Sequence, residues 1–71
     1  MHATTRALPP LITTSVDHHV AAAAHHEKAA ELHRQAAANY TYGEYQQANE
    51  QARQAKTHGK QAIEQCALAM E

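Results

Sequence analysis

Histidine is the residue of this sequence whose number and spacing point most clearly to chemistry. The chain of 71 residues holds seven, and five of them fall in one short stretch. Imidazole nitrogen is a common ligand of Zn, Cu and Ni, and a cysteine thiolate binds Zn or Cu(I). The sequence therefore predicts a transition-metal site drawn from His18, His19, His25, His26, His33, His58 and Cys66.

The spacing of these histidines excludes a site built on one helix. Two histidines of a helix share an ion when they are three or four residues apart. Here neighbouring pairs repeat every seven residues, which is about 10 Å along a helix axis. Any site must therefore join different helices. Three combinations are open: His19 with Cys66, aided by His18 or Met70; His26 with His58 and their counterparts in a second copy; and His25 with His26 of two copies.

Two metal-free roles compete with that prediction. Histidines at a helix interface can be neutral polar residues that set the register of packing, as single polar core residues do. They can also make association depend on pH. Cys66, the single cysteine, is equally compatible with a small buried apolar role.

The elements that must position these residues are two long helices. Residues 18–38 read as HHVAAAA, HHEKAAE and LHRQAAA, a seven-residue repeat typical of a helix. Thr14 and Asp17 fit a capping box, so we expect the first helix over residues 15–42. Gly43 predicts a turn, and a second helix is expected over residues 44–69.

The second helix carries small residues at alternating steps of three and four, which predicts a coiled-coil seam. These positions are Tyr45, Ala48, Ala52, Ala55, Gly59, Ala62, Cys66 and Ala69. A tight turn at Gly43 makes the helices antiparallel and sets His33 opposite Ala52, His26 opposite Gly59 and His19 opposite Cys66. Gly59 would then make room for the His26 ring. A kink at residues 57–59 is the alternative.

Residues 1–13 are predicted to form an extended or disordered arm, because Pro9 and Pro10 disfavour helix before them. Residues 14–71 form the helical hairpin, and the predicted fold class is all-α. A hairpin whose apolar residues are mostly alanine buries little apolar area, and so short a domain needs a partner. We therefore expect a homodimer that forms a four-helix bundle.

Composition argues against several functions. The formal net charge is −1, and no basic stripe predicts a nucleic-acid partner. There is no apolar run long enough to cross a membrane and no signal-peptide pattern. We expect a cytoplasmic protein, or a periplasmic one if a signal has been removed. No arrangement of nucleophile, base and acid predicts an enzyme.

Two resemblances follow from particular residues. The spacing of Tyr40, Gly43, Tyr45 and Ala48 resembles the turn of one tetratricopeptide-repeat hairpin, without a second copy in this chain. Ala24–Ala37, Tyr40–Gly43 and Ala48–Gly59 together resemble a group of small bacterial His/Ala-rich helical proteins. That resemblance implies a helical hairpin in a four-helix bundle and brings no established activity. Members tend to have more histidines in the second helix, where this chain has Gln51, Lys56, Lys60 and Gln65.

The function predicted from the sequence is thus a small non-enzymatic helical protein that binds Cu, Zn or Ni through histidines of different helices. The alternative is a structural or protein-interaction hairpin whose histidines lie in an interface without metal.

Overall fold

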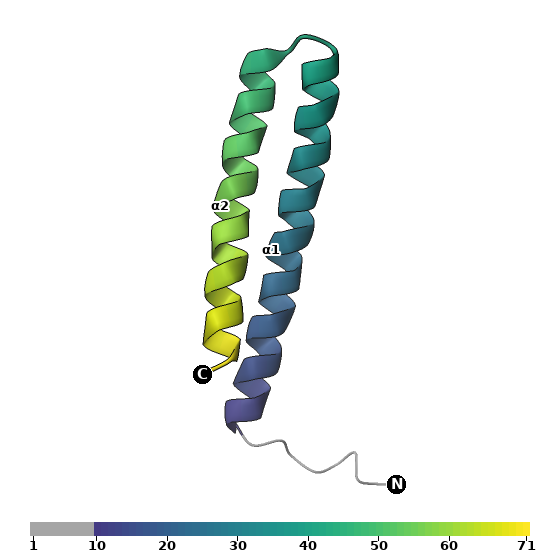
Figure 1. Cartoon of the computed structure of the whole chain (residues 1–71). Coiled ribbons are helices and arrows are strands. Elements are labelled where there is room, and N and C mark those ends of the chain that lie inside the picture. The colour runs from purple at the N-terminus through teal and green to yellow at the C-terminus, as the bar shows by residue number, and fades with distance from the viewer. Residues whose placement is uncertain (1–9) are drawn as a thin grey trace, which may run out of the picture.

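Two antiparallel helices make up the part of the chain that the structure describes. The structure is a computed structural model, and it describes the backbone of residues 10–71 and the side chains of residues 14–71. Helix α1 (Pro10–Thr41) and helix α2 (Tyr45–Ala69) lie side by side, and α1 extends past the end of α2 (Figure 1). The predicted all-α hairpin is confirmed. Neither described helix combines the length and the apolar character needed to cross a membrane.

The start of α1 differs from the prediction. The helix begins at Pro10, so residues 10–13 are helical and do not belong to an extended arm. Proline is favoured at the first helical position, because its φ is already helical and its missing N–H would have no partner there. The capping box of Thr14 and Asp17 was wrong, since both residues lie inside α1. The remainder of the predicted arm, residues 1–9, lies outside the described residues.

The turn forms where it was predicted. Gly43 has a φ of 79°, a left-handed conformation that glycine adopts without steric cost. The N–H of Gly43 donates to the carbonyl of Tyr40, and the N–H of Glu44 donates to the carbonyl of Asn39 at 2.7 Å. These bonds close the end of α1. Helix α2 then runs without a break through Gly59 to Ala69, so the alternative of a kink does not apply.

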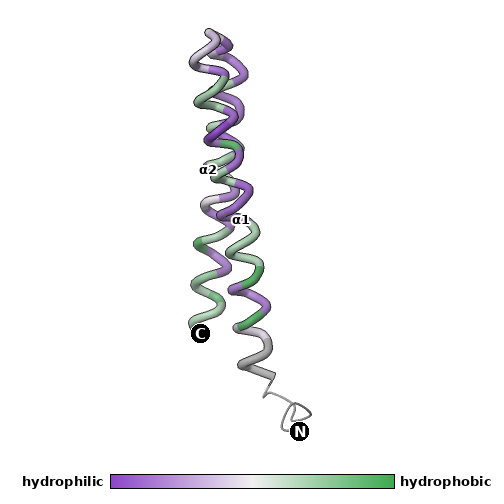
Figure 2. Tube along the Cα trace, turned by 90° about the vertical axis from the view of Figure 1, so that its right-hand side faces the viewer, coloured by the Kyte–Doolittle hydropathy of each residue, from purple (hydrophilic) through white to green (hydrophobic). Residues whose placement is uncertain are grey.

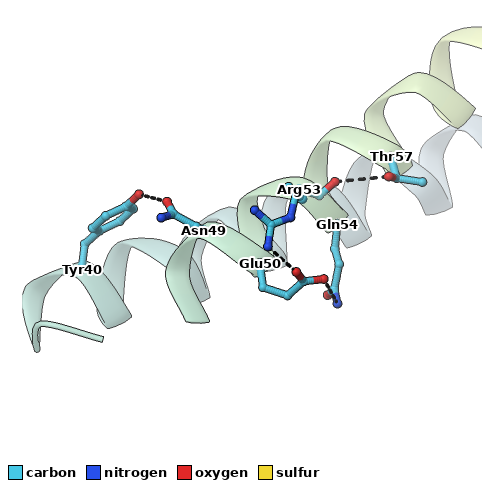
Figure 3. A network of polar contacts seen from close by, with 6 residues as sticks. All are labelled: Tyr40, Asn49, Glu50, Arg53, Gln54 and Thr57. Atoms are coloured by element: carbon cyan, nitrogen blue, oxygen red, sulfur yellow. Dashed lines mark hydrogen bonds and ion pairs between the residues drawn. The ribbon is translucent and has the colours of Figure 1, made fainter. Parts of the chain in front are cut away.

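Aromatic and polar side chains cover the turn and the first half of α2. The rings of Tyr40 and Tyr45 lie 5.8 Å apart between centroids, and the Tyr40 hydroxyl donates to Oδ1 of Asn49 (Figure 3). Further along α2, Arg53 pairs with Glu50. The Thr57 hydroxyl donates to the Arg53 carbonyl, as is common inside helices. The contacts of Tyr40 join α1 to α2 beside the turn, whereas those of Arg53 and Thr57 lie within α2.

The core between the helices is narrow and consists almost wholly of alanine. Its members are Ala22, Leu32, Ala36, Ala48, Ala55, Ala62 and Ala69. In α2 the buried alanines recur every seven residues and form one straight line along the helix. Leu32, 4% exposed, is the one large side chain among the buried residues of the described part. Alanine at the contact allows the helix axes to approach closely.

Each helix presents two different edges beside its buried line. Residues three positions after a buried alanine lie on one side of that line, and residues four positions after it lie on the other. Apart from the Tyr40–Asn49 bond beside the turn, the polar contacts between the helices lie on the first side, and we call it the polar edge: Gln35, Asn39, Gln51, His25, His58, His18 and Gln65. We call the second side the small-residue edge: His19, His26 and His33 of α1 with Ala52, Gly59 and Cys66 of α2.

Apolar residues outside the core gather at the open end, which we define as residues 14–24 and 60–71. Figure 2 shows the change along the hairpin: the trace is mostly hydrophilic towards the turn and more hydrophobic towards the open end. Val20 is 63% exposed, Ile63 66% and Met70 77%. Assembly of two hairpins into a bundle would cover these side chains.

Candidate metal centre

His25 and His58 form the one direct histidine–histidine contact among residues 14–71. Their Nδ1 atoms are 3.1 Å apart, and the ring centroids are 5.3 Å apart with 33° between the planes. His25 comes from α1 and His58 from α2, and both side chains are half-buried. In a neutral pair one ring carries its proton on Nδ1 and donates it to Nδ1 of the other. The contact joins the two helices, as the spacing along α1 required.

The separation of the two Nδ1 atoms suits two ligands of one metal ion. A tetrahedral ion with Zn–N bonds of about 2.0–2.1 Å holds its nitrogen ligands about 3.3 Å apart. Square-planar Cu(II) or Ni(II) with bonds of similar length holds neighbouring nitrogens about 2.9 Å apart. The 3.1 Å of the pair lies between these values. If both Nδ1 atoms turn their lone pairs to an ion, the remaining proton of each ring sits on Nε2.

The partner of His58 differs from the predicted one. His26 was expected to face Gly59 and to share a site with His58, whereas His25 contacts His58 and His26 is exposed. The expected role of Gly59 was also wrong. A Cβ atom added at Gly59 would meet nothing within 4 Å, so the glycine makes no room for the His26 ring.

The predicted partner of His58 and the observed one differ by one residue along α1, which is one position of the seven-residue repeat. His18, His25 and Leu32 are seven residues apart and share one position of the repeat, while His19, His26 and His33 share the next. Leu32 is the only leucine of residues 18–38, and its burial removes more apolar area from water than the burial of any alanine there. Because Leu32 enters the core, His18 and His25 turn to α2, and His19, His26 and His33 are exposed. The position of Leu32 was the signal that could have found the pair.

His18 lies one repeat before the pair and makes a different contact. Its Nδ1 donates to Oε1 of Gln65 at 2.6 Å. Sequence reasoning did not assign Gln65 a role. On the other side of the pair, towards the turn, Asn39 donates to Gln51 at 2.7 Å and Gln51 donates to Gln35 at 3.3 Å. Three layers of inter-helix polar contact thus follow one another along the polar edge.

Of the predicted combination of His19, Cys66 and Met70, the structure brings only the two sulfur-containing side chains close together. The Sγ of Cys66 lies 4.0 Å from Sδ of Met70, one turn further along α2. Cys66 is half-buried and has no disulfide. His19 is exposed on the small-residue edge of the other helix. His18, the further member of that combination, is turned to Gln65 on the polar edge.

The charges near the histidine pair are few. The residues three or four positions before and after His25 and His58 are alanine and glutamine, apart from Lys28. The acidic side chains lie on the outer faces. A hydrogen bond from Arg34, with one from Gln35, holds the pKa of the Glu31 carboxyl below its ordinary value. A hydrogen bond from Arg53 does the same to the pKa of Glu50. No carboxylate therefore competes for the pair from a neighbouring turn.

Within residues 14–71 the pair stands as a site with two protein ligands. No three His, Cys, Asp or Glu side chains of the described residues lie together as the ligands of an ion do. The same part of the chain has no pocket. Comparisons with protein-family models, with curated proteins and with solved structures find no match for this chain. The geometry of the described residues therefore carries the functional argument.

Proposed function

We propose that this protein binds one transition-metal ion, Zn(II), Cu(II) or Ni(II), between its helices at His25 and His58. The observation that carries the proposal is the 3.1 Å separation of the two Nδ1 atoms. Both rings are half-buried at the polar edge, where an ion can reach them from solvent. Imidazole is a borderline ligand that suits all three ions. The chain's own contribution is to hold two nitrogens, on two helices, at the spacing of one coordination sphere.

The neighbouring layers support that role. His18 with Gln65, and Asn39 with Gln51, fix the two helices to each other on both sides of the pair. Such contacts limit how far the two rings can separate when the ion is absent. A pair held near its bound geometry loses less conformational entropy on binding, which raises affinity.

Isothermal titration of chelator-treated protein with each of the three ions tests the proposal. Changing groups that merely orient a metal ligand costs about 10–100-fold in affinity. Removing a ligand with His25→Ala or His58→Ala should therefore weaken binding by at least about tenfold. His26→Ala and His19→Ala are the matched controls, since each removes an exposed imidazole next to a proposed contact residue, and they should leave the affinity unchanged.

Circular dichroism of each variant checks that the helices persist, because alanine favours helix at every one of these positions. Two results would contradict the proposal. One is binding that survives both His25→Ala and His58→Ala. The other is an equal loss of metal affinity in His26→Ala, which would mean that the histidines bind the ion without a defined pair of ligands.

The second candidate function is a metal-free homodimer or interaction module that builds a four-helix bundle. The observation that favours it is the exposure of Val20, Ile63 and Met70 at the open end. In a bundle of two hairpins these side chains would be covered, and the alanine core would gain larger neighbours. In that case the histidines of the pair act as polar residues that set the register between α1 and α2.

Sedimentation equilibrium separates the two candidates. An interaction module should associate equally well with and without chelator, and Ile63→Gln should weaken the association. Gln61→Ala is a control on the same helix that removes a side chain without apolar character. Association that requires metal, and that Ile63→Gln leaves intact, would contradict this second candidate.

A further inference from the structure

The histidine pair provides only half of a usual coordination sphere. Structural zinc sites have four protein ligands in a tetrahedron, and catalytic sites have three. His25 and His58 supply two, and the described residues hold no third His, Cys, Asp or Glu close enough to join them. The remaining ligands must come from water or from outside this hairpin.

The pair lies at the middle of both helices. His25 is at the centre of α1, which spans Pro10–Thr41, and His58 is one residue past the centre of α2, which spans Tyr45–Ala69. A twofold axis that passes through the polar edge at this height brings the pair of a second copy against the pair of the first. Twofold dimers are the commonest closed assembly, and each of their interfaces is formed by the same surface patch of both copies.

The rest of the polar edge is compatible with such a contact. It consists of uncharged amides and imidazoles, which donate and accept hydrogen bonds and can therefore face copies of themselves. The layers beside the pair are His18 with Gln65 on one side and Gln51 with Asn39 on the other. Of the residues three or four positions from His25 or His58, which share their side of the helix, Lys28 is the only charged one. Two copies approaching along this edge meet little like-charge repulsion.

We propose that a second copy of this chain completes the metal site, so that one ion is held by His25 and His58 of two hairpins. This inference rests on the proposed metal function and adds its partner. Four imidazoles supply all four ligands of a tetrahedral or square-planar ion from protein, whereas two imidazoles leave two positions to water. The metal ion then acts as the link between the copies, and the dimer interface is the polar edge and not the exposed apolar residues of the open end.

Native mass spectrometry and sedimentation equilibrium of the full chain, with Zn(II) added stepwise to chelator-treated protein, test this assignment. We expect one zinc per two chains, with the doubling of mass complete at half an equivalent of zinc. His58→Ala should abolish the zinc-dependent doubling. Ile63→Gln, which changes an exposed apolar residue of the open end and leaves the polar edge untouched, should leave the doubling intact and is the matched control.

The outcomes distinguish this inference from the function on which it rests. One zinc per monomer, lost in His58→Ala, would overturn the shared site and leave the proposed function standing. A dimer that forms without zinc and is unaffected by His58→Ala would also overturn it. If no zinc binds at any protein concentration, both proposals fail together.

Discussion

The polar edge and the small-residue edge of the hairpin follow the same seven-residue repeat, but they consist of different side chains. The polar edge joins α1 to α2 through paired side chains, His18 with Gln65 and His25 with His58. On the small-residue edge, Ala52 and Gly59 present little side chain, and His26 of the other helix is exposed. His25 and His26 are neighbours in the chain, yet one lies in an inter-helix contact and the other faces outwards. Position relative to the buried line, and not histidine content, decides which imidazoles act together.

The largest effect expected from any single change falls on the core, at the position of the repeat that Leu32 shares with His25. Leu32→Ala should lower the free energy of unfolding by roughly 2–5 kcal/mol, because it removes the one large side chain buried among residues 14–71 and leaves a void. Urea unfolding followed by circular dichroism measures this. Val20→Ala, an exposed aliphatic of the same helix, should change the free energy by less than about 0.5 kcal/mol. Equal effects of the two changes would mean that Leu32 does not set the edges.

A second prediction compares adjacent histidines in metal-free protein. His25→Ala should lower the free energy of unfolding by about 0.5–1.5 kcal/mol, the net value of one hydrogen bond between side chains. His26→Ala replaces an exposed residue by a better helix former and should be neutral or slightly stabilising. The free energy of unfolding of both variants, measured in the presence of chelator, tests this prediction. If His26→Ala is the more destabilising change, the assignment of the edges is reversed.

A third prediction concerns the residue that follows His58. Gly59→Ala should raise the free energy of unfolding by about 0.5–1 kcal/mol, since an added Cβ meets no atom within 4 Å and alanine stabilises a helix interior. Thermal unfolding of dilute protein tests the hairpin itself. At higher concentration the same variant probes the small-residue edge: a loss of association there would show that another chain packs against Gly59.

The smallest predicted effect lies on the outer face, away from both edges. Bonds from Arg34 and Gln35 hold the pKa of Glu31 below its ordinary value of 4.5. The stabilisation from these bonds is therefore complete above pH 4.5 and is lost as pH falls through the lowered pKa. The difference in Tm between the wild type and Glu31→Gln should shrink across that acidic window. Because Glu31 is exposed, added salt at neutral pH should shrink it too. A difference that grows on acidification would refute the pairing.

Much of the fold could be predicted because the signals are local. Gly43 interrupts two helical patterns, and the run of alanines at intervals of seven defines the buried line of α2. The start of α1 was missed because Thr14 and Asp17 were taken as its cap and Pro10 was placed in the arm, although a proline at the first position begins a helix. The resemblance to small bacterial His/Ala-rich proteins stays a prediction, as no comparison tests it.

The candidate site could be predicted only in part. The sequence predicted that any metal site must join different helices, and it named His58 among the residues of the second helix that could take part. Choosing His25 over His26 required the rotation of α1 about its axis to be known within one residue. Small residues fix that rotation weakly, because alanines at several neighbouring positions fill a seam equally well. Leu32, through its larger buried area, removes this ambiguity.

The alanine core has a thermodynamic consequence. The heat capacity of unfolding grows with the apolar surface that becomes exposed. Six of the seven buried residues of the described part are alanines, and larger aliphatic residues such as Ile63 are exposed before unfolding begins. The heat-capacity and enthalpy changes per residue are then small, so the stability curve is shallow. The hairpin should lose its helices gradually over a wide span of temperature, and whatever covers its outer surface would sharpen that transition.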